Sequence, residues 1–152
     1  MYPAGYFVHL LFVIGRQRDL RIEDLLRPLG VSLAAQRVLR AVRRYGSVTM
    51  GELADFAIID RTTLTRIVDQ LVAKGFIERS KPASDRRKVT LTLTEAGEEA
   101  HAAMVRVISR DNDDLLRDLP EKDLRTAVRL QQRIVTRLVG DEQLLRRLLW
   151  LE

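Results

Sequence analysis

The stretch VTMGELADFAIIDRTTLTRIVDQLVAKGFIERSKPASDRRKVTLTLTEAG, residues 48–97, decides the fold of this chain. Its first half has the pattern of two short helices with a break near residues 57–59. Its second half has the pattern of a hairpin, because two alternating runs flank the charged tetrapeptide DRRK at 85–88. Helix, break, helix and basic hairpin in this order predict a winged helix-turn-helix.

The first helix has a clear start. Thr49 and Glu52 have the spacing of a capping box, and Val48 with Leu53 has the spacing of a hydrophobic staple. Both motifs place the first helical residue at Met50, and the helix should end near residue 56.

The second helix has both a start and a stop signal. Asp60 is a good N-cap, and Ile59 with Leu64 repeats the staple spacing. Gly75 is suited to the left-handed residue that follows a helix. We therefore expect a helix from residue 61 to 74, with one apolar stripe made of Leu64, Ile67, Val68 and Leu71.

These pieces together resemble the MarR family of transcriptional regulators. The resemblance rests on the helix-turn-helix DRTTLTRIVDQLVAKGFIER at 60–79, on the wing SDRRKVTLTLTEAG at 84–97, and on long helical arms on both sides. It covers essentially the whole chain. The break FAIID at 56–60 departs from the Gly-containing turn that is commoner in the family.

The resemblance implies a mainly α fold with a small β-hairpin wing, and N- and C-terminal dimerisation helices. We expect one domain over 1–152, with a winged-helix DNA-binding part at about 32–94 and dimerisation helices at about 5–29 and 95–152. A symmetric dimer of this kind predicts a pseudo-palindromic site in double-stranded DNA, with half-site centres about 34 to 36 Å apart.

The residues of the arms support helices there. A first helix over about 6–27 should end at Pro28 and Gly30, and Ser32 should cap a helix over 33–45. Thr94 is the N-cap of a long helix that runs toward residue 116. We expect Pro120 in the first turn of the last helix, which Gly140 and Asp141 interrupt before an apolar end, LLRRLLWL at 144–151. This end would be a large exposed patch on a monomer, so it favours a homodimer.

Composition narrows the class of protein. The chain has 152 residues, of which 46% are hydrophobic and 31% charged, as in a globular domain. It has no apolar run long enough for a membrane span and no signal-peptide pattern, so we expect a cytoplasmic protein. It has no cysteine, which excludes disulfides, thiolate metal sites and cysteine-based peroxide sensing.

The distribution of charge is more informative than its total. A net charge of +5 is compatible with nucleic-acid binding but common in other proteins. Five basic side chains fall within the hairpin and two more on the preceding helix, which would produce a positive potential directed at phosphates: Arg79, Lys81, Arg86, Arg87, Lys88, Arg61 and Arg66.

By resemblance, the helix from residue 61 is the recognition helix. Its N-terminal residues would face the major groove, where arginine can bind guanine with two hydrogen bonds and threonine can contact thymine or phosphate. We expect Arg66 to read a base. Thr63 has an equally good interpretation as a helix-start residue with a solvated hydroxyl, and Asp69 as a surface charge or ion-pair partner. The full set expected at DNA on this helix is Arg61, Thr62, Thr63, Thr65 and Arg66.

In the wing, the family pattern has Asp85 brace an arginine while the tip enters the minor groove. Either Arg86 or Arg87 can be the inserted residue, and a solvated charged turn is the plain alternative. Lys81 and Lys88 are expected to contact phosphates, which positions the protein without specifying sequence. Further backbone contacts by family analogy are Ser32 and Gln36.

The resemblance also implies regulation by a small aromatic or anionic effector, bound between the arms and the winged helix. The residues that combine aromatic and cationic character on the first two helices are His9, Phe12, Arg16, Arg40 and Arg43. A histidine such as His9, or His101 on the long helix, is more commonly a polar interface residue than a ligand group.

Enzymatic classes fit poorly. The chain has two scattered histidines, no cysteine and no phosphate-binding glycine motif. The run DNDD at 111–114 lacks the glycine and the terminal glutamate of a calcium loop, so we interpret it as a solvated helix face. No cofactor and no metal site are expected. The main alternative is an architectural or protein-interaction winged-helix dimer with little sequence specificity, which would show a salt dependence but no preferred palindrome.

Overall fold

The computed structural model describes residues 3–57, 59–81 and 89–148. It is mainly helical with one small sheet, as the sequence predicts. The elements in chain order are α1 (Pro3–Leu26), the 3-10 turn η1 (Arg27–Leu29), α2 (Leu33–Tyr45), β1 (Val48–Thr49), α3 (Met50–Ala57), α4 (Arg61–Ala73), β2 (Ile77–Ser80), β3 (Thr90–Leu93), α5 (Glu95–Leu116), α6 (Glu121–Leu138) and α7 (Glu142–Leu148).

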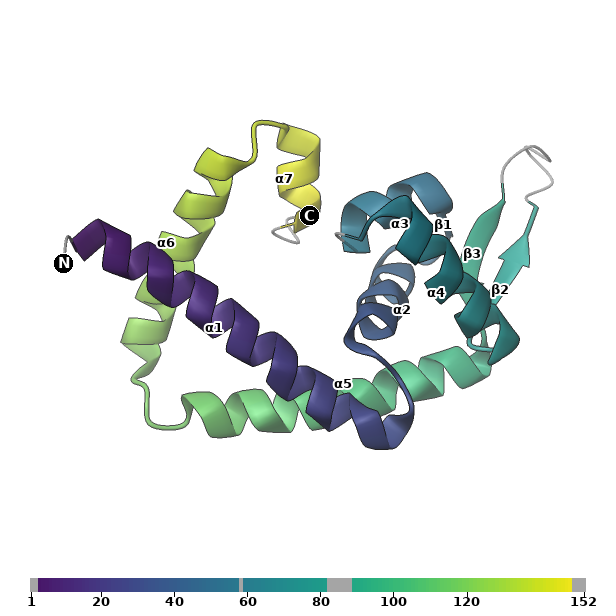
Figure 1. Ribbon diagram of the computed structural model, residues 1–152, viewed down its shortest axis with the longest axis horizontal. Coiled ribbons are helices and arrows are strands. Elements are labelled where there is room, and N and C mark those ends of the chain that lie inside the picture. Colours follow the sequence, from purple (N-terminus) through teal and green to yellow (C-terminus); the bar gives the residue numbers. More distant parts are fainter. Residues whose placement is uncertain (1–2, 58, 82–88, 149–152) are drawn as a thin grey trace.

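Two parts are visible in Figure 1. A winged helix, made of α2, α3, α4 and the sheet, lies at one end of the molecule. Helices α1, α5 and α6 form an open frame at the other end, in which α5 leads away from the sheet and α6 turns back to cross α1. The short helix α7 returns from α6 and contacts α3.

The helix boundaries in the winged helix follow the predicted caps. The Thr49 amide donates to Glu52 Oε2 over 2.9 Å, and the Glu52 amide donates to Thr49 Oγ1 over 3.4 Å, which confirms the capping box. Gly75 has φ 70°, and the amide of Phe76 donates to the carbonyl of Leu71, which closes α4 with a Schellman motif.

The sheet has three antiparallel strands in the order β1-β3-β2. The hairpin of β2 and β3 is the predicted one, with Ile77 opposite Leu93 and Ser80 opposite Thr90. Strand β1 is absent from the sequence prediction, because two residues are too short for alternation to reveal them. Val48 nevertheless pairs with Leu91, so it serves the sheet as well as the entry to α3.

One core holds the winged helix and the inner ends of the arms together. It includes the predicted apolar stripe of α4 and the inward side chains of α2, and it reaches Leu26 of α1 and Met104 of α5. Burial of each large apolar side chain contributes about 1.5 to 3 kcal/mol. The fully buried members are Leu26, Val38, Leu39, Val42, Val48, Leu53, Leu64, Val68, Ile77, Leu91 and Met104.

The arms differ from prediction in two places. Helix α1 begins at Pro3, three residues before the expected start, and ends at Leu26. Pro120 was expected in the first turn of α6 but is its N-cap, because its ψ of 137° is extended and the helix begins at Glu121. The predicted interruption at Gly140 and Asp141 is confirmed, since α6 ends at Leu138 and α7 begins at Glu142.

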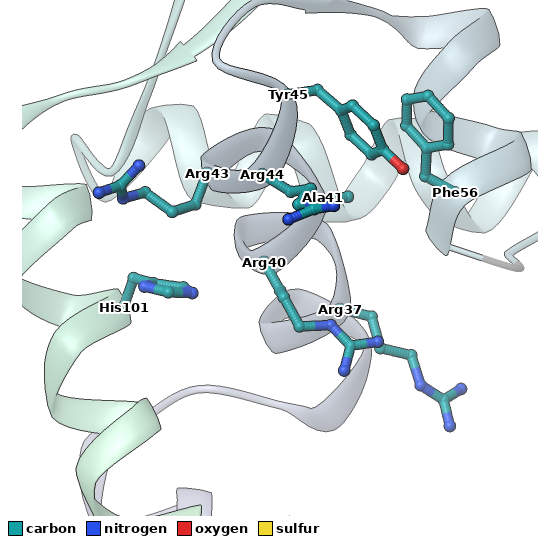
Figure 2. A pocket seen from close by; sticks show the side chains of 8 residues that line it. All are labelled: Arg37, Arg40, Ala41, Arg43, Arg44, Tyr45, Phe56 and His101. Atoms are coloured by element: carbon teal, nitrogen blue, oxygen red, sulfur yellow. The ribbon is translucent and has the colours of Figure 1, made fainter. Parts of the chain in front are cut away.

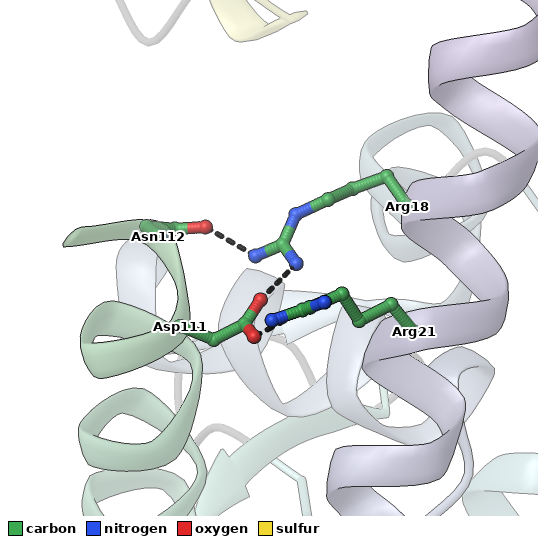
Figure 3. A network of polar contacts seen from close by, with 4 residues as sticks. All are labelled: Arg18, Arg21, Asp111 and Asn112. Atoms are coloured by element: carbon green, nitrogen blue, oxygen red, sulfur yellow. Dashed lines mark hydrogen bonds and ion pairs between the residues drawn. The ribbon is translucent and has the colours of Figure 1, made fainter. Parts of the chain in front are cut away.

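The interpretation of residues 111–114 as a solvated face is wrong for Asp111. Its side chain is buried, with the residue only 6% exposed, and it accepts hydrogen bonds from Arg18 and from Arg21, whose Nε lies 2.6 Å from Asp111 Oδ1 (Figure 3). Arg18 also donates to Asn112. Burial raises the pKa of Asp111, but the hydrogen bonds from Arg21 and Arg18 and their charges lower it overall. This network joins α1 to α5.

The frame leaves many apolar side chains uncovered in the single chain. Phe12 of α1 is 71% exposed and Leu138 of α6 is 78% exposed. Among the described residues, no helix combines the length and the apolar character needed to cross a membrane. Other large exposed apolar residues of α1 and α6 are Tyr6, Phe7, Val8, Leu10, Ile14, Leu20, Val128 and Leu130.

Candidate functional site

The N-terminus of α4 is fixed by its cap. Asp60 is extended, with ψ 150°, and its Oδ1 accepts from the amide of Thr63 over 2.9 Å. Hydrogen bonding from Thr63 lowers the pKa of the Asp60 carboxyl group, and the bond from the backbone amide has the largest effect. Its amide thus makes Thr63 part of the helix start, although its side chain is half-buried and not fully solvated.

One face of α4 is buried and the opposite face is exposed. The apolar stripe packs into the core, so the polar side chains of the other face are presented to solvent. They line a single open hollow on the surface. The lining residues are Arg61, Thr62, Thr65, Arg66 and Asp69. Four of the five residues predicted for DNA on this helix therefore share one accessible surface, whereas Thr63 is half-buried.

Asp69 has a partner on the hairpin. Arg79 of β2 donates to Asp69 Oδ1 over 2.5 Å, which selects the ion-pair alternative for Asp69. The hairpin itself is held by the contact of Ser80 Oγ with Thr90 Oγ1 at 3.0 Å. Arg79, which the sequence predicts to face phosphates, is thus paired with a carboxylate and links α4 to β2.

The other predicted DNA contacts lie in three different settings. Lys81 is exposed at the end of β2, where the described part of the hairpin stops. Ser32 is exposed and caps α2, with its Oγ accepting from the amide of Ala35 over 3.1 Å. The predicted tip residues Asp85, Arg86, Arg87 and Lys88 lie outside the described residues.

Gln36 departs from its expected role. It is only 7% exposed, because it lies on the inner side of α2 with Val38 and Leu39 in the core. A phosphate needs an accessible donor, so the buried amide of Gln36 is poorly placed as a backbone contact.

A second hollow lies where α2 meets α3 and α5. It has a volume of about 200 Å³ and combines four guanidinium groups, an imidazole and a stacked pair of aromatic rings (Figure 2). The rings of Tyr45 and Phe56 are 3.9 Å apart at an angle of 19°. The lining residues are Arg37, Arg40, Ala41, Arg43, Arg44, Tyr45, Phe56 and His101. We call this hollow the arginine pocket.

Two of the guanidinium groups are held by carboxylates. Arg37 donates to Asp19 Oδ1 of α1 over 2.9 Å, and Arg43 Nε lies 2.6 Å from Glu98 Oε2 of α5. Both carboxylates come from the arms, so these pairs link α2 of the winged helix to α1 and α5.

The pKa values of Arg40 and His101 are both lowered in the arginine pocket, mainly by burial and further by neighbouring arginines. Burial lowers the pKa of Arg40, and the charge of Arg37 lowers it further. Burial also lowers the pKa of His101 below 6.5; Glu98 opposes this effect, whereas Arg43 and Arg40 add to it. These effects favour the uncharged form of His101.

The predicted effector residues divide between two places. Arg40 and Arg43 line the arginine pocket, whereas His9, Phe12 and Arg16 are exposed on α1 and do not line it. The sequence does not predict the other six lining residues, which are Arg37, Ala41, Arg44, Tyr45, Phe56 and His101. A signal for two of them was present, because residues 37, 40 and 44 have helical spacing and so share one face of α2.

Comparison with known proteins gives consistent matches. The model of the MarR family matches residues 31–89. The multiple antibiotic resistance protein MarR of Escherichia coli is 27% identical over 134 residues, which cover 88% of this chain and 91% of that protein. The HTH-type transcriptional regulator FarR of Neisseria gonorrhoeae is 34% identical over 110 residues, which cover 65% of this chain and 75% of that protein.

Solved structures show the same architecture. A MarR family transcriptional regulator from Silicibacter pomeroyi superposes with a TM-score of 0.80 at 26% identity, over 90% of this chain and 92% of that one. A mutant of MarR from E. coli, crystallised in complex with operator DNA, superposes with a TM-score of 0.73 at 27% identity. The match covers 88% of this chain and 94% of that one.

Proposed function

Because this chain belongs to the MarR family of transcriptional regulators, we propose that it is a sequence-specific regulator that binds double-stranded DNA as a homodimer. The observation that carries the proposal is the exposed face of α4, where Arg61, Thr62, Thr65 and Arg66 share one surface beside the hairpin. A protein of the same fold binds operator DNA.

The chemistry of this face suits the major groove. The guanidinium of Arg66 can donate two hydrogen bonds to guanine O6 and N7, which discriminates guanine from other bases. Arg61 lies in the first turn of α4, where the helix dipole also favours a phosphate. Lys81 contributes phosphate contacts, and in the proposal the tip residues Asp85, Arg86, Arg87 and Lys88 place an arginine in the minor groove.

The homodimer explains the exposed apolar faces of the frame. Side chains such as Phe12 and Leu138 form an uncovered surface that is unusual for a monomer. A two-fold dimer through α1, α5 and α6 covers it and presents two α4 helices to successive major grooves. The operator is then pseudo-palindromic, with half-site centres about 34 to 36 Å apart.

The arginine pocket supplies the regulatory half of the proposal. Its guanidinium groups and the stacked Tyr45 and Phe56 suit a small ligand with an aromatic body and a negative charge. The pocket walls come from the winged helix and from α5. A ligand that prefers one spacing of these parts therefore changes the DNA affinity, and we propose a ligand-responsive repressor.

The test of DNA binding is selection of bound duplexes from a random DNA pool, with competitor DNA at a salt concentration of about 150 mM. The proposal requires an enriched pseudo-palindrome with one-turn half-site spacing. Binding without an enriched motif, by a folded protein, would favour the architectural alternative. The double variant R61E/R66E, which changes only the exposed face of α4, should abolish enrichment while the protein remains folded.

A further inference from the structure

Acidic and basic side chains occupy separate segments in and before α6. Residues 111–123 contain six carboxylates and two basic side chains. Residues 124–138 contain four arginines and no carboxylate, and the arginines recur every four residues, at 125, 129, 133 and 137. Residues four apart on a helix lie on the same side, so the arginines form one positive stripe.

The C-terminal half of this stripe borders a hollow. Arg133 and Arg137 line it together with an apolar floor made of Leu130 and Ile134 of α6 and Phe7 of α1. We call these five residues the arginine groove. Arg125 pairs with Glu121 within α6, but neither Arg133 nor Arg137 forms an ion pair with any residue that the structure describes.

The corner between α5 and α6 has the complementary character. Three leucines are exposed there, Leu115 and Leu119 by about half and Leu116 by somewhat less. Beside them, Asp114 is held by Arg117, whereas Asp113 and Asp118 have no ion-pair partner among the described residues. We call residues 113–119 the acidic corner. Phe7 and Leu130 of the apolar floor are exposed by more than two fifths in the described part of the chain. The leucines of the corner suit this floor, and its aspartates suit the arginines.

We propose that the arginine groove of one protomer receives the acidic corner of a second copy of this chain, and that the match restricts pairing to the correct register and to its own kind. The inference rests on the proposed homodimer. The groove residues of α6 lie in its C-terminal half, whereas the corner precedes its first residue. Figure 1 shows the turn from α5 into α6 at the opposite end of α6 from α7. A two-fold axis that sets two α6 helices antiparallel therefore places each corner at the other's groove, and makes the contact twice.

The apolar and the charged contacts have different energetic roles. Burial of the leucines on the apolar floor supplies affinity, whereas the charges mainly suppress wrong registers and wrong partners, because like charges in contact repel each other. A related chain without this charge pattern would then pair poorly with this one.

Charge reversal tests the pairing in the full-length protein. The groove variant R133E/R137E and the corner variant D113K/D118K each place like charges at both contacts of a homodimer. An equimolar mixture forms a heterodimer in which one contact has its charges exchanged and the other is native, so both are attractive. At a salt concentration of about 50 mM we expect each variant to dissociate at least about tenfold more readily than the wild type, and the mixture to regain the wild-type value. Sedimentation equilibrium measures the dissociation constants, and native mass spectrometry detects the heterodimer in the mixture.

The matched control is R61E/R66E, which reverses two arginines on the exposed face of α4 and should leave self-association unchanged. If the wild type is a dimer and both charge variants dissociate as the wild type does, the inference is overturned but the homodimer stands. Failure of the mixture to restore pairing, with both variants folded by circular dichroism, would overturn it as well. A wild-type protein that is monomeric at all concentrations would instead contradict the proposed homodimer.

Discussion

Gly97 in the first turn of α5 lies directly against the backbone of Phe76: a Cβ on residue 97 would stand 2.0 Å from the Phe76 carbonyl oxygen. The same oxygen accepts from the amide of Thr94 over 3.1 Å, and Thr94 Oγ1 donates to the carbonyl of Gly75 over 2.5 Å. The start of α5 is thus fixed to the turn that follows α4. The orientations of α4 and α5 are therefore linked through this contact.

Replacing Gly97 by alanine should therefore destabilise the protein. The added methyl group meets a backbone oxygen that is already used in a hydrogen bond, so α5 must shift, at an expected cost of about 3 kcal/mol in the free energy of unfolding. Urea denaturation measures the loss. Gly51, in the first turn of α3, is the control, because a Cβ there has only an ordinary contact at 4.0 Å with Thr49 Oγ1. Equal stability of G97A and G51A would contradict the close approach.

Asp111 should be a stabilising link between α1 and α5. D111N removes the charge that Arg18 and Arg21 share, and we expect a loss of about 1 to 3 kcal/mol. The pKa of Asp111 is lowered on folding, so the contribution is present above the ordinary carboxyl pKa of 3.8 and is lost as the pH falls through the folded value. Thermal unfolding of D111N and wild type at pH 7 and at decreasing pH should show that the difference in stability between the two proteins shrinks in acid.

D24N is the control, since its ion pair with Arg27 is exposed and contributes little. A constant difference at every pH would show that charge is not the cause.

Arg66 and Lys81 should differ in what they contribute to DNA binding. R66A is expected to lose about 1 to 3 kcal/mol on the selected operator and to relax the preference at one base position. K81A should weaken binding to all sequences alike and reduce the dependence of affinity on salt, because it removes a phosphate contact. Fluorescence anisotropy with the operator, single-base variants and unrelated duplexes, at several salt concentrations, separates the two. The same profile for both variants would refute this division of roles.

The sequence revealed the parts of the fold that local interactions determine. The caps at Asp60 and Thr49 and the stop at Gly75 involve groups no more than five residues apart, so their spacing can be read directly. Asp111 is different, because its partners Arg18 and Arg21 are 93 and 90 residues away and only the crossing of α1 and α5 brings them together. A local pattern of acidic residues could only suggest a solvated face.

The candidate sites show the same division. The exposed face of α4 follows from helical periodicity, since a buried stripe leaves the opposite side chains in solvent. The arginine pocket does not, because His101 and Phe56 reach it from helices whose packing no single pattern specifies. Arg40 and Arg43, predicted for their charge, line the pocket, whereas the three predicted residues of α1 lie on turns of that helix that do not line it.

His101 should make effector binding depend on pH. Its pKa is lowered below 6.5 in the folded protein by burial, so the stability that its neutral form provides is complete above 6.5 and is lost as the pH falls toward the folded value. A bound carboxylate favours the imidazolium, so the affinity for an aromatic acid such as benzoate should rise as the pH falls from about 7.5 to 5.5, by up to about tenfold for each unit that binding raises the pKa of His101. Calorimetric titration of the wild type and of H101Q measures this, and H101Q should give a flat profile because glutamine does not titrate. R40A should weaken binding at every pH without changing the slope, since it removes a positive charge and leaves His101 in place. A slope retained in H101Q would assign the titration to another group and remove His101 from the proposed mechanism.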